Sequence, residues 1–179
     1  LVVTHADDAA EVQWFERVAD VADDLGLPCI APDDPNDPDV VGRIRALAPD
    51  FLFSFYYRRM LKRPLLRLAP RGALNLHGSL LPHYRGRAPV NWAVLRGETH
   101  TGATLHYMES KPDAGDIVGQ QAVPILPDDT ARDVFAKVTV AAEIVLDAAL
   151  PRLVAGTAPR LPQELAQGSY FGGRTAGDG

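Results

Sequence analysis

Apolar residues recur along the chain with two different periods, and these periods outline the predicted elements. Between Ala9 and Leu25 the steps are four, three and four, which is the spacing of one face of a helix. The residues on this predicted buried face are Trp14, Val18, Val21 and Leu25. Gly26 follows at the position where a glycine commonly ends a helix. The pattern therefore predicts a helix over 9–25.

A strand and a second helix are predicted directly afterwards. Leu27–Ala31 is a short apolar run, as expected for a strand. Asp37 then precedes Pro38, and an aspartate cap with proline at the first helical position favours a helix start. The predicted buried face of this helix comprises Val41, Ile44 and Leu47.

The middle of the chain alternates between strand and helix patterns. Phe51–Phe55 is a compact apolar run of the kind that is buried on both faces in parallel sheets. A short helix is expected to begin near Pro64, and Ala73–His77 is predicted as the next strand. Pro89–Arg96 is predicted as a helix that stops at Gly97.

Two further strands are predicted at Ala103–Met108 and Ile117–Ile125. The segment between them is rich in turn-forming residues, which favours an antiparallel pair at the sheet edge. Thr130 and Asp133 then form a capping-box pattern at the start of a long amphipathic helix. Its predicted apolar face comprises Val134, Val138, Ala141, Val145 and Leu146. Pro151 is predicted to end or kink this helix.

Strands that alternate with helices predict an α/β fold, in which helices flank a mostly parallel sheet. Leu1–Thr4 resembles the end of a strand already under way, so we expect the chain to lack the first strand of its fold. Residues 1–156 are expected to form one catalytic domain. Residues 157–179, rich in glycine, proline and polar side chains, are expected to be a C-terminal tail or a linker toward a second domain.

Composition narrows the class of protein. A chain of 179 residues with 46% hydrophobic residues can bury one core. A net charge of −5 disfavours nucleic-acid binding through bulk charge. The single cysteine, Cys29, leaves no internal disulfide and fits a reduced, cytoplasmic setting. No apolar run has membrane length and no charged leader precedes an apolar core, so no membrane partner is expected.

Candidate chemistry lies at the end of the strand 73–77. Alternation along a strand places Asn75 and His77 on the same face, at the sheet edge where α/β folds bind ligands. An amide donor beside an imidazole suits acyl transfer, because asparagine can stabilise an oxyanion while histidine exchanges a proton. The alternative is structural, since asparagine is common at turns and single histidines are often satisfied core residues.

A carboxylate would be needed to orient His77, and two candidates lie in the turn-rich segment. Asp113 and Asp116 are both suitable, and their spacing does not distinguish them. No metal is expected, because the five histidines show no ligand spacing. They are His5, His77, His83, His100 and His106. No Gly-x-Gly-x-x-Gly follows a strand, so no nicotinamide cofactor is expected either.

The chain resembles the 10-formyltetrahydrofolate-dependent formyltransferases through motifs that appear in the same order. These are Asn75-x-His77, Ser79–Pro82, Arg85-Gly86, Ala88-Pro89, Gly97, Thr101-Gly102 and Asp113–Asp116. The resemblance is closest to the UDP-4-amino-4-deoxy-L-arabinose formyltransferase domains of bifunctional polymyxin-resistance proteins. Phe53–Arg58, His83–Trp92 and Phe171-Gly172-x-Arg174-Thr175 carry that closer resemblance.

The resemblance implies a Rossmann-like catalytic domain and a role for each candidate residue. Asn75 would stabilise the oxyanion, His77 would transfer a proton, and Asp113 would hold His77 and raise its pKa. The formyl donor, 10-formyltetrahydrofolate, would be bound without a metal. Its implied contacts are Arg59, Met60, Leu61, Arg87, Glu109, Ser110, Lys111, Pro112 and Asp113.

The resemblance also implies an acceptor, the amine of a nucleotide-linked amino sugar, and thereby a role in lipid A modification and antibiotic resistance. Three alternatives stay open at this point. They are methionyl-tRNA formylation, which the acidic charge and Arg87 disfavour, hydrolysis of formyltetrahydrofolate, and a truncated module that binds without catalysis. The sequence does not define the oligomeric state.

Overall fold

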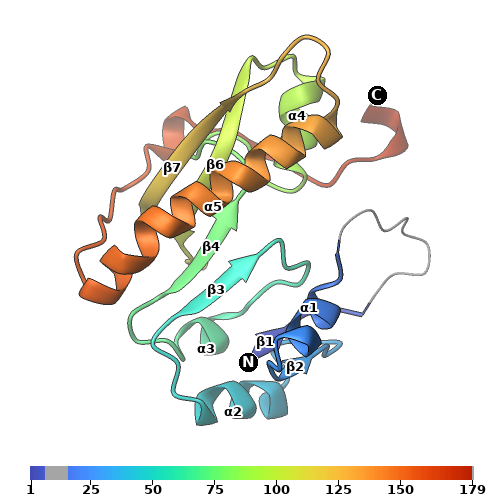
Figure 1. Cartoon of the computed structure of the whole chain (residues 1–179). Coiled ribbons are helices and arrows are strands. Elements are labelled where there is room, and N and C mark those ends of the chain that lie inside the picture. The colour runs from blue at the N-terminus through green and yellow to red at the C-terminus, as the bar shows by residue number, and fades with distance from the viewer. Residues whose placement is uncertain (7–15, 179) are drawn as a thin grey trace. The chain divides into compact units, whose positions relative to one another are not determined.

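The computed structural model describes residues 1–6 and 16–178, and its chain divides into two compact units (Figure 1). The first unit comprises Leu1–Leu52 and Tyr56–Arg71. The second comprises Phe53–Phe55 and Gly72–Gly179. Asn75, His77 and Asp113 all belong to the second unit.

The first unit contains a small parallel sheet and three helices. β1 (Val2–Val3) pairs in parallel with β2 (Cys29–Ile30). The helices are α1 (Val18–Asp24), α2 (Pro38–Ala46) and α3 (Arg63–Leu66). The carboxylate of Asp37 accepts the Asp39 N–H at 2.9 Å and Pro38 lies in the first turn, so the predicted start of α2 is confirmed.

The apolar core of this unit is small. Val41, Ile44 and Leu65 are buried in it, so α2 packs against α3. Partly buried side chains surround these three, namely Val3, Val40, Leu52, Leu61 and Leu68.

Two of the predicted buried faces in the first unit are partly wrong. Trp14 lies outside the described residues, and α1 exposes Val18, Val21 and Leu25 while burying Ala22. In α2, Val41 and Ile44 are buried as predicted but Leu47 is exposed, because the helix ends at Ala46 and Leu47 is its C-cap. Periodicity thus identified both helices but not every side chain that finds a partner.

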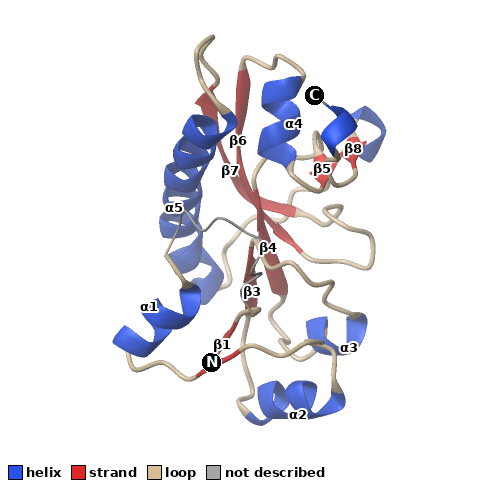
Figure 2. Ribbon diagram, turned by 90° about the vertical axis from the view of Figure 1, so that its right-hand side faces the viewer, coloured by secondary structure: helices blue, strands red, loops and turns tan. Residues whose placement is uncertain are grey.

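The second unit is built on a four-stranded sheet with the order β3-β4-β6-β7. The strands are β3 (Leu52–Phe55), β4 (Ala73–His77), β6 (His100–Tyr107) and β7 (Ile117–Pro124). Helix α5 (Ala131–Ala155) runs along β6 and β7, as Figures 1 and 2 both show. Helix α4 (Pro89–Leu95) connects the loop after β4 to β6.

The predicted α/β class with flanking helices is confirmed. The predicted antiparallel pair is confirmed as β6 and β7, which place Thr104 opposite Gln120. β6 is also antiparallel to β4, so the antiparallel part of the sheet reaches one strand further in than the pattern indicated. In that pairing Asn75 lies opposite His106, and His77 lies opposite Thr104.

The expectation that β3 is buried on both faces is wrong. Ser54 is buried, whereas Phe53 and Phe55 are 36% and 47% exposed. Alternation along the strand sends both phenylalanines to the same face, where their rings stack with centroids 6.0 Å apart. The continuous apolar run therefore predicted more burial than the side chains of β3 have.

Helix α5 is capped as predicted but is longer than predicted. The Thr130 hydroxyl and the Asp133 carboxylate form the reciprocal capping box. The helix continues through Pro151 to Ala155 and ends at Gly156, whose φ is 73°. Its buried face comprises Val134, Val138, Ala141, Ala142, Val145, Ala149 and Leu153. Among the described residues, no helix is both long enough and apolar enough to cross a membrane.

The last part of the chain packs against the loop that follows β4. β8 (Tyr170–Phe171) pairs in parallel with β5 (Arg85–Gly86), and Leu161 forms an antiparallel bridge with Ile117 of β7. Two short 3-10 helices, η1 (Leu165–Gln167) and η2 (Ala176–Asp178), complete the segment. We call residues 160–172 the C-terminal strap. The division at residue 156 into a catalytic domain and a tail stays a prediction.

Gly86 is required where the strap crosses the loop. Its φ is +100°, and a Cβ atom there would collide with the carbonyl oxygen of Phe171. We expect Gly86→Ala to reduce the free energy of unfolding by about 2 kcal/mol or more, because strain and collision act together. Urea denaturation measures this change.

The matched control for Gly86→Ala is Gly42→Ala, in the middle of α2, where a Cβ atom has open space. This substitution is expected to stabilise the protein by about 0.5–1 kcal/mol, because alanine favours the helix. Equal effects at the two positions would contradict the account of the strap.

Candidate active site

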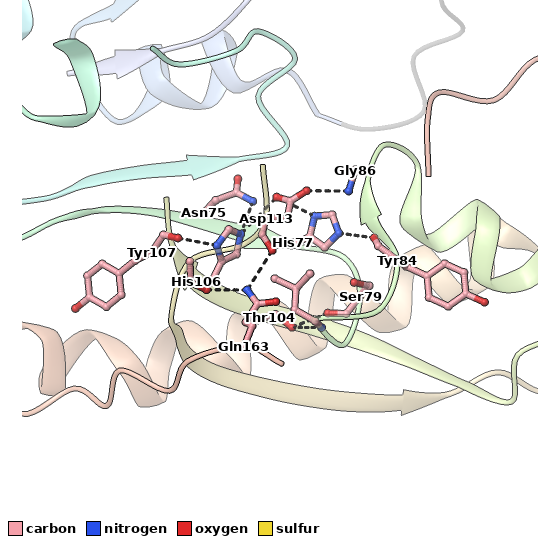
Figure 3. Close-up of polar contacts among 12 residues, drawn as sticks. Asn75, His77, Ser79, Tyr84, Gly86, Thr104, His106, Tyr107, Asp113 and Gln163 are labelled. Atoms are coloured by element: carbon pink, nitrogen blue, oxygen red, sulfur yellow. Dashed lines mark hydrogen bonds and ion pairs between the residues drawn. The ribbon is translucent and has the colours of Figure 1, made fainter. Parts of the chain in front are cut away.

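Two neighbouring strands bring three polar side chains together in the interior of the second unit (Figure 3). Alternation along β4 places Asn75 and His77 on one face, as predicted from the sequence. Asn75 Nδ2 lies 3.2 Å from His106 Nε2, on the strand directly opposite. His77 and His106 are 6% and 1% exposed, so both imidazoles are removed from solvent.

Asp113 supplies the carboxylate, and its Oδ1 atom lies beside both histidines. The distances are 3.7 Å to His77 Nδ1 and 3.5 Å to His106 Nε2. The other oxygen, Oδ2, accepts the backbone N–H of Gly86 at 2.8 Å. Asp116, the other candidate, instead forms an ion pair with Arg160 at 3.4 Å. The structure therefore identifies Asp113, and not Asp116, as the carboxylate beside His77, a choice that the sequence spacing did not make.

Backbone carbonyls define which nitrogen of each imidazole carries hydrogen, because only an N–H can donate to a carbonyl oxygen. His77 Nε2–H donates to the carbonyl of Tyr84 at 2.8 Å, which leaves Nδ1 as the free lone pair facing Asp113. His106 Nδ1–H donates to the carbonyl of Tyr107 at 2.8 Å, so its Nε2 accepts from the Asn75 amide. His77 Nδ1 is thus the position where a proton can be taken up.

Burial dominates the pKa of His77 and lowers it below the ordinary value near 6.5. The negative charge of Asp113 and the bond to Tyr84 act in the opposite direction but do not outweigh burial. Asp113 by itself therefore raises the pKa of His77, as expected. The net direction is downward, so His77 is neutral at neutral pH.

The pKa of Asp113 is held below its ordinary value. Burial alone would raise it, but a proton on the His106 or His77 ring and the Gly86 N–H lower it. Asp113 is therefore a carboxylate at neutral pH, ready to stabilise a proton that arrives on His77.

A second set of hydrogen bonds fixes the loop after β4. The Thr104 hydroxyl donates to the carbonyl of Ser79 at 2.6 Å and accepts the Leu81 N–H at 3.2 Å. Gln120 donates to the same hydroxyl and to the carbonyl of Leu81, each at 2.9 Å. The loop thereby leaves the strand in one defined direction.

The strap fixes Tyr84, whose carbonyl holds His77. The Tyr84 N–H donates to the Ser169 hydroxyl at 2.8 Å. The Tyr84 ring stacks on Phe171 with centroids 5.1 Å apart, and Phe171 stacks in turn on Trp92 at 5.0 Å. This ring stack holds Tyr84 in a left-handed conformation with φ of 57°.

The residues predicted to contact a folate lie in both units. Arg59, Met60 and Leu61 belong to the first unit. In the second unit, Arg87 is exposed after β5, and the Glu109–Pro112 loop is exposed just before Asp113. Their role in folate binding stays a prediction.

His106 is the functional candidate that the sequence reasoning missed, because the five histidines are scattered along the chain without a ligand spacing. The available signal was the alternation of Thr104 and His106 along a predicted apolar strand, which puts two polar side chains on one face. Among residues 1–6 and 16–178, no group of three His, Cys, Asp or Glu side chains is arranged to hold a metal ion.

Comparison with known proteins gives a consistent result. Residues 1–150 match a family described as formyl transferase. A sugar N-formyltransferase from a Shewanella species superposes with a TM-score of 0.72 at 25% identity, over 85% of this chain and 58% of that one. A phosphoribosylglycinamide formyltransferase from Bacillus halodurans superposes with a TM-score of 0.73 at 26% identity, over 86% of this chain and 79% of that one. This chain thus spans less than two thirds of the Shewanella protein.

A third structure shares the fold at lower identity. It is the formyltransferase PseJ from Anoxybacillus kamchatkensis, in complex with UDP-4,6-dideoxy-4-formamido-L-AltNAc and tetrahydrofolate. The TM-score is 0.69 at 24% identity, over 96% of this chain and 84% of that one.

The electrostatic account of His77 predicts the effect of Asp113→Asn. NMR titration should give His77 a pKa below 6.5 in the unmodified protein. Asp113→Asn should lower this pKa further, because the variant removes an attraction that favours the protonated ring.

The control for this titration is Asp147→Asn, which removes an exposed carboxylate on α5 and should leave the pKa of His77 unchanged. A rise of the His77 pKa in Asp113→Asn would contradict the account.

Proposed function

Because the chain belongs to the formyl transferase family, we propose that it transfers a formyl group from 10-formyltetrahydrofolate to an amine. The acceptor amine is carried by a nucleotide-linked amino sugar. The observation that carries the proposal is the grouping of Asn75, His77 and Asp113 around His106. Asn75 is hydrogen-bonded to His106, and Asp113 Oδ1 lies within 3.7 Å of both imidazoles.

His77 has the properties of a proton acceptor for this reaction. Its lowered pKa keeps it neutral at neutral pH, and its free Nδ1 can take the proton that an attacking amine releases. The imidazolium that results would be stabilised by Asp113, whose Oδ1 lies 3.7 Å away. The bond to Tyr84 keeps the ring in place while the proton moves.

Asn75 is the proposed donor to the negative charge that develops on the formyl oxygen. One N–H of its amide group donates to His106 Nε2. Because the amide group is planar, this hydrogen bond also fixes the direction of the second N–H. His106 therefore fixes the rotation of the Asn75 side chain. Removing such a donor commonly costs a factor of about 100–1,000 in kcat.

The proposed folate contacts are those that the resemblance implies. Arg87, Glu109, Ser110, Lys111 and Pro112 would contact the folate beside Asp113.

A nucleotide-linked sugar is the acceptor class that the motifs favour. The His83–Trp92 segment and the Phe171-Gly172-x-Arg174-Thr175 sequence resemble the UDP-4-amino-4-deoxy-L-arabinose enzymes. In the structure these two segments pack together through the rings of Tyr84, Phe171 and Trp92. PseJ, which has the same fold, was crystallised with a formylated UDP-sugar. We therefore propose UDP-4-amino-4-deoxy-L-arabinose as the first acceptor to test, and with it a role in lipid A modification.

His77→Ala should reduce kcat for acceptor-dependent transfer from 10-formyltetrahydrofolate by a factor of about 100–10,000, because the general base is lost. Steady-state kinetics with UDP-4-amino-4-deoxy-L-arabinose measures this change. The control is His100→Ala, which removes an exposed histidine at the start of β6 and should keep normal activity. Full activity of His77→Ala would contradict the proposed role of His77 as the proton acceptor.

A second set of assays tests the acceptor class. In one assay glycinamide ribonucleotide replaces the amino-sugar nucleotide as the acceptor. This acceptor is chosen because the chain is similar to the Bacillus halodurans phosphoribosylglycinamide formyltransferase. A blank without acceptor measures hydrolysis. Turnover only with the amino-sugar nucleotide supports the proposal, whereas formate release in the blank alone would identify a hydrolase. Turnover with glycinamide ribonucleotide alone would overturn the sugar proposal but keep the reaction class.

A further inference from the structure

Gln163, in the C-terminal strap, reaches the loop that carries Asp113 (Figure 3). Its side-chain Nε2 donates to the backbone carbonyl of Asp113 at 3.1 Å and to that of Gly115 at 2.7 Å. The two carbonyls lie 50 and 48 positions earlier in the sequence. One amide group therefore joins the end of the chain to the residue that bridges the two histidines.

The loop around Asp113 has a conformation that needs outside support. Asp113 has a φ of 51°, a left-handed conformation that is strained for a residue other than glycine. Gly115 packs so closely on the Tyr107 backbone that a Cβ atom would collide with the Tyr107 carbonyl. The two hydrogen bonds from Gln163 lie on either side of Ala114 and stabilise this path of the backbone.

Neighbouring contacts hold Gln163 in place. Leu161 and Ile117 exchange backbone hydrogen bonds of 2.8 and 2.9 Å. Arg160 pairs with Asp116 at 3.4 Å, and its guanidinium lies 3.8 Å from the centroid of the Tyr107 ring. The Oε1 atom of Gln163 is buried and has no hydrogen-bond partner among the described residues. The side chain therefore acts through its two donated bonds.

We propose that Gln163 is a positioning residue for the formyl-transfer reaction, which holds the 113–115 loop so that the Asp113 carboxylate lies between His77 and His106. This inference rests on the proposed function for its kinetic consequence. The positioning itself is a statement about Asp113 and the two titratable groups that face it, His77 from β4 and His106 from β6. Loss of the two bonds would let the loop relax and move the carboxylate away.

Gln163→Met removes both donors and keeps the length of the side chain. We expect kcat for formyl transfer to fall by a factor of about 10–100, while KM for the donor and acceptor stays within about threefold, because a misplaced group slows chemistry more than binding. NMR titration of the same variant should show the His77 pKa falling further, because Asp113 no longer supports the protonated ring.

Gln167→Met is the matched control, since it makes the same chemical change on an exposed side chain four positions along the strap. It should leave kcat and the His77 titration unchanged. Gln163→Asn is the conservative variant, because it keeps a neutral amide donor and the unpartnered Oε1 leaves no bond to lose. It should keep more of kcat than Gln163→Met.

Several outcomes would overturn the positioning role. They are an unchanged His77 titration in folded Gln163→Met, an equal loss in Gln167→Met, or a lower kcat in Gln163→Asn than in Gln163→Met. If Gln163→Met does not fold, Gln163→Ala removes the same two donors and decides through its His77 pKa. The titration needs no substrate, so it tests the positioning even if the protein transfers no formyl group. In that case the proposed function fails and the positioning is still measured.

Discussion

The carboxylate of Asp113, shared between two buried histidines, is the interaction on which the rest of the site depends. A carboxylate and two imidazoles that have left water are stable only when their partners compensate for lost hydration. Here Gly86 donates to one oxygen, the other lies where it stabilises a proton on either ring, and the pKa of Asp113 is lowered despite burial. In the proposed reaction the site therefore keeps His77 neutral beforehand and stabilises a proton that arrives on the ring.

The C-terminal strap holds both sides of this interaction. At one side, Gln163 holds the backbone of Asp113, and at the other Ser169 and Phe171 hold Tyr84, whose carbonyl orients His77. A segment that composition describes as a tail therefore belongs to the architecture of the site. Gly86, between β5 and β8, links the two sides because its N–H binds Asp113 while its backbone contacts Phe171.

Local patterns predicted the elements and two of the key residues, because both depend on short-range rules. Alternation along 73–77 was sufficient to place Asn75 beside His77, and capping chemistry located the starts of α2 and α5. The choice of Asp113 over Asp116 and the presence of His106 depend on strand register and loop path, which the sequence pattern does not contain. The exposure of Phe53 shows the same limit, since an apolar run does not say what covers it.

The most direct test of the central claim is a double-mutant cycle on kcat/KM for formyl transfer, with His77→Asn, Asp113→Asn and the double variant. If Asp113 acts through His77, the double variant should be about as slow as His77→Asn alone, because groups that work as a unit lose activity together. Multiplicative losses, in which the double variant falls by the product of the two single effects, would show that the two side chains act independently and would contradict the account.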